Sequence, residues 1–164
     1  MDGNYFRLSI ADSTKPRETD VWAMVLRKDS LVMEKYVEDF DRAGVFGPEF
    51  RLDSSRRYHL SEADSNRLWQ IVRSADPTKW EGIYSAGYER SGNVTWNTTY
   101  LTGVRTYVSH GRNRFPAEGG AAYLESGKEH YIEEIAMALL AYGKQTNEIE
   151  MKLLPGSNRN RTSE

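Results

Sequence analysis

The chain has 164 residues, a formal net charge of −2 and no cysteine. A chain of this length fits one domain that buries roughly 70% of its unfolded surface. The lack of cysteine excludes disulfide bonds, thiolate catalysis and cysteine-based zinc sites. The acidic balance argues against nucleic-acid binding by the whole surface, but not by a local basic patch. No apolar run approaches the ~20 residues of a membrane span and no secretory signal is visible, so we expect a cytoplasmic protein without a membrane partner.

The first third of the chain predicts strands. Apolar and polar residues alternate from 5 to 10, as in a half-buried strand. Residues 21–27 are apolar on both faces, which predicts an interior strand covered on both sides. Residues 31–37 then return as the second arm of a hairpin. The acidic stretch 38–49 contains two glycines and a proline, so we expect a loop there.

Two segments carry helical periodicity. Ser61 precedes an apolar stripe with three- and four-residue spacing that ends before Pro77, which predicts a helix with Ser61 as its N-cap. A second helix is expected after Ser126, because Ser126 and Glu129 have the spacing of a capping box. Its apolar residues recur at helical spacing from 132 to 143.

Strand patterns return between the two helices and after the second. The alternation from 94 to 101 and from 104 to 108 predicts two strands with a turn near Gly103. Residues 82–88 are expected to form a hairpin with the first of them. Residues 149–153 alternate again and predict a closing strand.

This order of elements predicts an α+β fold. We expect a mainly antiparallel β-sheet of about six or seven strands with two amphipathic helices packed on one face. No internal repeat divides the chain, so residues 1–154 are expected to form a single domain. The polar residues 155–164 are expected to be a disordered C-terminal tail.

Basic and aromatic side chains gather in the segment from Arg105 to Phe115, which contains no acidic residue. Cations interleaved with stacking rings are typical of surfaces that bind single-stranded nucleic acid. We therefore regard this segment, and its glycine-containing loop from His110 onward, as a candidate binding surface. Its candidate residues are Arg105, Tyr107, His110, Arg112, Arg114 and Phe115. The alternative is a solvated loop with Phe115 in the core.

The chain is rich in aromatic residues, with four tryptophans, ten tyrosines and five phenylalanines. Tryptophan, tyrosine and arginine contribute most of the binding energy at protein interfaces. Trp80, Trp96 and Tyr100 are therefore candidates for exposed anchors that bind another protein. The competing interpretation is an ordinary half-buried role in the sheet.

Catalytic patterns are weak. His110 lies in a glycine-containing loop, where a general base or an anion site can occur, but no nucleophile accompanies it at a recognisable spacing. Glu148 and Glu150 resemble the E-x-E element of ADP-ribosyltransferases, in which two acids on an extended segment could orient a ribose and an acceptor. His130 precedes Glu133 and Glu134 at helical spacing, and we expect a solvated surface pair rather than a metal site. No cofactor or metal is expected.

These observations favour a small non-enzymatic binding protein. We expect stoichiometric protein–protein interaction, in the manner of immunity proteins, antitoxins or phage-encoded inhibitors. The alternative is a nucleic-acid-binding module that uses the Arg105 to Phe115 segment. A third reading is an enzyme with a site near His110 or near Glu148 and Glu150. The sequence leaves self-association open.

Overall fold

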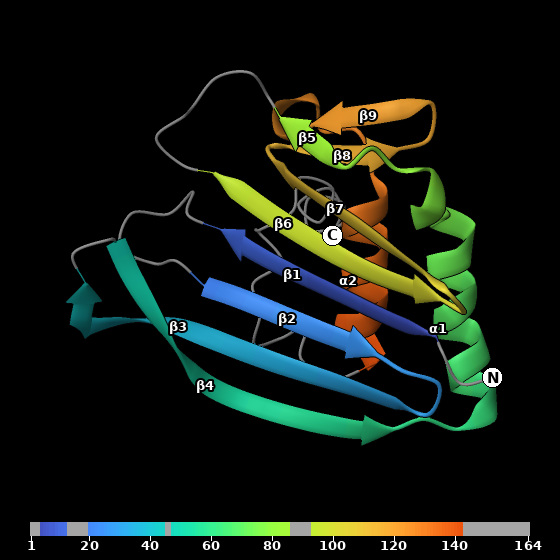
Figure 1. Ribbon diagram of the computed structural model, residues 1–164, viewed down its shortest axis with the longest axis horizontal. Coiled ribbons are helices and arrows are strands. Elements are labelled where there is room, and N and C mark those ends of the chain that lie inside the picture. The colour runs from blue at the N-terminus through green and yellow to red at the C-terminus, as the bar shows by residue number, and fades with distance from the viewer. Residues whose placement is uncertain (1–3, 13–19, 45–46, 86–92, 143–164) are drawn as a thin grey trace, which may run out of the picture.

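The computed structural model describes residues 4–12, 20–44, 47–85 and 93–142 (Figure 1). A seven-stranded sheet has the order β4-β3-β2-β1-β6-β7-β5, and β8 and β9 form a separate two-stranded sheet. The elements are β1 (Tyr5–Asp12), β2 (Asp20–Leu26), β3 (Ser30–Gly44), β4 (Gly47–His59), α1 (Glu62–Ala75), β5 (Ile83–Ser85), β6 (Val94–Thr102), β7 (Arg105–Arg112), β8 (Arg114–Ala117), β9 (Gly120–Tyr123) and α2 (Tyr131–Tyr142). The prediction of an α+β fold with a mainly antiparallel sheet is confirmed, because among the described strands only β5 and β7 pair in parallel.

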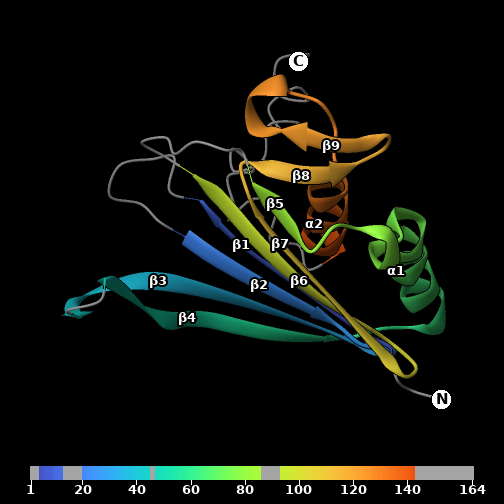
Figure 2. The same ribbon diagram turned by 45° about the horizontal axis from the view of Figure 1, so that its top comes forward.

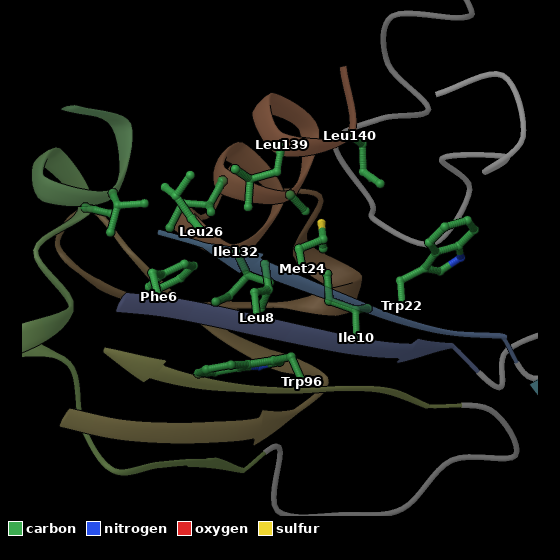
Figure 3. Packing of buried hydrophobic residues seen from close by; sticks show 14 of the residues in the cluster. Phe6, Leu8, Ile10, Trp22, Met24, Leu26, Trp96, Ile132, Leu139 and Leu140 are labelled. Atoms are coloured by element: carbon green, nitrogen blue, oxygen red, sulfur yellow. The ribbon is translucent and has the colours of Figure 1, made fainter. Parts of the chain in front are cut away.

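One face of the sheet carries the hydrophobic core. The register pairs Leu8 of β1 with Met24 of β2, and alternate residues along both strands are buried. Figure 3 shows Ile132 and Leu139 of α2 pointing toward Leu8 and Met24. Helix α1 adds Trp69 to the same cluster. The period-two pattern of the strands and the apolar stripes of the helices therefore meet in one core.

Helix α1 begins and ends as the sequence predicts. The Ser61 hydroxyl accepts the backbone N–H of Asp64 at 3.1 Å, which satisfies one donor of the first turn. Asp76 caps the C-terminus with φ 47°, and Pro77 follows it directly. The indole N–H of Trp69 donates to the Arg27 carbonyl at 3.1 Å, which fixes the helix to the connection between β2 and β3.

The prediction for the start of the second helix is wrong. The Ser126 hydroxyl accepts the N–H of Lys128, two residues on, and Gly127 has φ 64°, so the chain turns there instead of entering a helix. Helix α2 begins at Tyr131. His130 acts as its N-cap, since the imidazole Nδ1 accepts the N–H of Glu133 at 3.1 Å. Histidine is an uncommon N-cap, which is why the sequence pattern favoured the serine.

Two further predictions are corrected by strand pairing. Residues 38–49 belong mostly to β3 and β4, because Glu38 pairs with Phe50 and the glycines Gly44 and Gly47 face each other at the end of the hairpin. Strand β5 does not form a hairpin with β6. It pairs in parallel with β7, on the edge of β7 that faces away from β6. Figure 2 shows the outer ends of β3 and β4 extending away from the helices.

The opposite face of the sheet has no described helix over it. In Figure 1, α2 lies behind the sheet, and no described helix lies in front of it. Val21 and Val25 of β2 are accordingly only half-buried, so the prediction that this strand is covered on both sides is wrong. We call this surface the open face. In the described part of the chain, neither helix has the length and apolar character needed to cross a membrane. The predicted strand 149–153 and tail 155–164 lie outside the described residues.

Candidate functional site

Exposed apolar side chains gather on the open face. Six large apolar side chains are exposed in the part of the chain that the structure describes. Four of them lie on the open face, because each is paired with a residue of that face on the neighbouring strand. Directly paired residues on neighbouring strands share a face of the sheet. Phe50 pairs with Glu38 and Leu52 with Tyr36, at the β4 edge; Ile83 pairs with His110 and Val108 with Thr99, near the β5 edge. The open face thus has an apolar group near each edge.

A shallow hollow of about 650 Å³ lies over β6, β7 and β5. Two rows of side chains on the open face line it: Asn97, His110 and Ile83 in one row, and Thr95, Arg112 and Ser85 in the next. Val108 completes its rim. We call this the β5–β7 hollow. Ile83 and Val108 are 63% and 59% exposed, so both can contact a ligand without any movement of the sheet.

Hydrogen-bond donors dominate the polar part of the hollow. Arg112 and His110 are exposed there, and Arg7 of β1 donates from Nη1 to Oδ1 of Asn97 at 3.4 Å. Because arginine can only donate, Asn97 turns its oxygen to Arg7 and keeps its amide N–H groups for another acceptor. None of the described residues that line the hollow is Asp or Glu. The hollow is therefore a local basic region in a chain of net charge −2.

The open face is polar at β3, the strand next to the β4 edge. The Tyr36 hydroxyl donates to Oε2 of Glu34 at 3.0 Å. Burial raises the pKa of Tyr36, and the hydrogen bond to Glu34 raises it further. The phenol therefore stays protonated and donates to Glu34, whose paired residue on β4 is Ser55.

The expectation that Trp96 and Tyr100 are exposed anchors is wrong. They are 2% and 7% exposed, because alternation along β6 turns both toward the core. The Trp96 indole donates to the Arg114 carbonyl at 2.8 Å and lies 5.6 Å from the Tyr84 ring. Trp80 is half-buried and stacks on Tyr131 at 6.2 Å. These aromatic residues connect the sheet to the helices.

The predicted basic and aromatic loop is not one surface. Phe115 is fully buried and Tyr107 lies on the core side of β7. The Arg114 guanidinium lies over the rings of Tyr84 and Tyr123, at 5.4 and 5.7 Å, and 3.8 Å from Glu81. Arg114 thus holds β8, β9 and β5 together.

Of the six candidate residues in that segment, only His110 and Arg112 line the hollow. His110 and Arg112 lie two apart on β7 and share the open face. Arg105 begins the same strand roughly 17 Å from His110, since a strand rises about 3.4 Å per residue. The turn between β7 and β8 is Asn113, whose φ is 56°.

Sequence reasoning missed Ile83, Asn97 and Val108. The alternation that places Trp96 in the core places Asn97 on the opposite face, so this residue could have been found. The same holds for Val108, which flanks the buried Ser109. Ile83 could not have been found, because its position depends on the parallel pairing of β5 with β7.

The expectation that His130 forms a solvated pair is also wrong. The residue is 3% exposed, and its ring stacks on Phe115 with 3.9 Å between centroids. Burial lowers the pKa of His130 to about 3. Its Nε2 lies 3.9 Å from Oε2 of Glu133, which is beyond a hydrogen bond. His130 is therefore a neutral core residue at physiological pH.

The described residues give no support to the catalytic and metal-binding interpretations of the sequence. Within the described ranges, no three His, Asp or Glu residues lie close enough to hold a metal ion. Glu148 and Glu150, with the E-x-E resemblance, lie outside the described residues. No protein-family model matches the chain, and no curated protein matches it either.

Proposed function

We propose that the protein acts by stoichiometric binding to another protein through the open face of its sheet. The observation that carries this proposal is the grouping of Phe50, Leu52, Ile83 and Val108 on one face without a described helix over it. Exposed apolar groups with polar surroundings, such as the two groups near opposite edges of this face, are typical of interaction surfaces in soluble proteins.

The dimensions of the face suit such an interface. Seven strands spaced about 4.8 Å apart give a width of about 29 Å, and the eight residues of the central strand β1 give a length of about 26 Å. The resulting area of roughly 750 Å² is close to the ~800 Å² that each partner contributes to a standard interface. An antiparallel sheet is also rigid, so little ordering cost opposes binding.

We further take the protein to be cytoplasmic and non-enzymatic, of the immunity, antitoxin or phage-inhibitor type, which blocks a target by occupying its surface. This arrangement requires both helices to pack on the core face. The support is that α2 side chains point to that face in Figure 3, and that Trp69 of α1 stacks on Tyr100 at 6.4 Å.

The nucleic-acid alternative has weaker support. Its aromatic members Phe115 and Tyr107 lie away from the open face, and Arg114 is held between two rings. Stacking on bases needs exposed ring faces, and among the described lining residues of the hollow His110 is the exposed ring, beside the aliphatic Ile83 and Val108.

The test is capture of a partner from the native cell with the full-length chain and three aspartate variants. Ile83→Asp and Val108→Asp place a charge on the open face and should each reduce the captured partner at least tenfold. Val104→Asp is the matched control, since Val104 is 93% exposed but lies in the β6–β7 turn. Equal capture by all variants, or no partner for the unaltered chain, overturns the proposal.

A further inference from the structure

We propose that the β5–β7 hollow recognises an acidic, aliphatic segment of the partner protein, with a carboxylate next to a branched aliphatic side chain. This inference rests on the proposed function and specifies the chemistry of its partner. It is carried by the arrangement of donors and aliphatic groups in the hollow.

A guanidinium, an imidazole and two aliphatic side chains lie at short range from one another there. Arg112 and His110 lie two residues apart on one strand, so their backbones are about 7 Å apart. Ile83 is the direct neighbour of His110 on β5, and Val108 lies two residues before His110 on β7. A segment that places a carboxylate at Arg112 therefore brings its next side chains over Ile83 and Val108. Guanidinium and carboxylate form charge-assisted hydrogen bonds of matching geometry.

The charges around the hollow favour an anion. Arg7 contributes a second guanidinium at the rim through its hydrogen bond to Asn97. Glu81 is close in sequence to Ile83, but its carboxylate lies 3.8 Å from Arg114. Glu34 is on the same face, four strands and about 19 Å from β7, which exceeds the ~8 Å screening length at physiological salt, but it is only two strands, about 10 Å, from Arg7 on β1.

The apolar part of the hollow distinguishes a protein from a nucleic acid. The rings of Tyr84 and Trp96 line it but are only 3% and 2% exposed, which leaves His110 as the exposed ring among its described lining residues. The accessible apolar groups are instead Ile83 and Val108, which suit aliphatic side chains of a protein. Among the described lining residues, bases would find only the His110 imidazole to stack on.

Two matched peptides test this inference by titration into the ¹⁵N-labelled full-length chain. The probes are acetyl-Ile-Glu-Ile-Glu-amide and its neutral counterpart acetyl-Ile-Gln-Ile-Gln-amide. The acidic peptide should shift amide signals of Ile83, Asn97 and His110, bind about tenfold more tightly than the neutral one, and weaken with added salt.

Variants locate the contact. Arg112→Gln should remove the preference for the acidic peptide, and His110→Gln should reduce it. Arg105→Gln is the matched control, because Arg105 is an exposed arginine on the same strand but outside the hollow, and it should leave the preference unchanged. A thermal melt of each variant establishes that the fold persists.

The outcomes separate this inference from the proposed function. Equal affinity for both peptides, or no shift at the hollow, overturns the inference, whereas the proposed function is judged by partner capture with Ile83→Asp. Tighter binding of a single-stranded oligothymidine than of the acidic peptide overturns the inference in favour of nucleic-acid recognition.

Discussion

His130 should make the stability of the protein depend on pH. It is buried and neutral in the folded state, where burial lowers its pKa to about 3, whereas an unfolded histidine has its ordinary value of 6.5. The unfolded state therefore binds a proton between these two values that the folded state does not accept. The free energy of unfolding therefore has its full value, as far as His130 is concerned, above pH 6.5, and it decreases as the pH falls from 6.5 toward 3.

The size of this effect follows from the two pKa values. Each pH unit below 6.5 lowers the free energy of unfolding by about 1.4 kcal/mol. By pH 4.5, His130 alone should lower it by about 2.7 kcal/mol relative to pH 8. The Glu133 carboxylate, 3.9 Å from Nε2, would favour the protonated ring, but burial against Phe115 opposes it and dominates.

Urea unfolding of the unaltered chain and of His130→Asn at pH 8 and pH 4.5 measures this effect. Asparagine can accept the Glu133 N–H and so keeps the helix cap, but it does not titrate. The variant should be less stable at pH 8, where the Phe115 stack is lost, and the difference should shrink by about 2.7 kcal/mol at pH 4.5. His110→Asn removes an exposed histidine and should keep the original profile. A difference between the chain and His130→Asn that is independent of pH would refute this reasoning.

Three further substitutions test local structure by the same unfolding assay. Gly111→Ala should destabilise the fold by about 1–3 kcal/mol, because an added Cβ would lie 2.6 Å from Nε1 of Trp96. Asn113→Ala should cost about 1–3 kcal/mol, since Oδ1 of Asn113 accepts the buried N–H of Val94 at 2.8 Å and φ is 56°. Ser61→Ala should cost about 1 kcal/mol through loss of the α1 cap, with an unchanged fold. A loss below about 0.3 kcal/mol in any of them would show that the named contact does not stabilise the protein.

The fold class could be predicted because local patterns agree with it. Alternation identified β1 and β6, and periodicity with Ser61 and Pro77 identified α1. The β3–β4 hairpin could not be predicted at its outer end, because the acidic, glycine- and proline-containing sequence there is typical of a loop, whereas the strands form by backbone pairing across the hairpin. The start of α2 was misplaced because His130 supplies the cap through a ring nitrogen.

The candidate site was only partly accessible from the sequence. His110 and Arg112 were identified from charge, which is a property of the residues themselves. Ile83 was not identified, because the hollow forms where β5 joins the sheet beside β7, and that pairing links residues far apart in the chain. Long-range pairing of this kind leaves no local pattern.

Side chains along β6 and β7 alternate between the core and the open face, and this alternation decides which substitutions can report on function. Trp96 and Asn97 are neighbours in the chain, yet Trp96 contacts Tyr84 in the core and Asn97 contacts Arg7 on the open face. A change at Trp96 would remove its hydrogen bond and its stacking partners, so any loss of binding would follow from loss of the fold. Changes at Val108 leave the core unchanged, because this side chain is on the other side of the sheet. The exposed residues of these strands are therefore the ones whose substitution separates binding from stability.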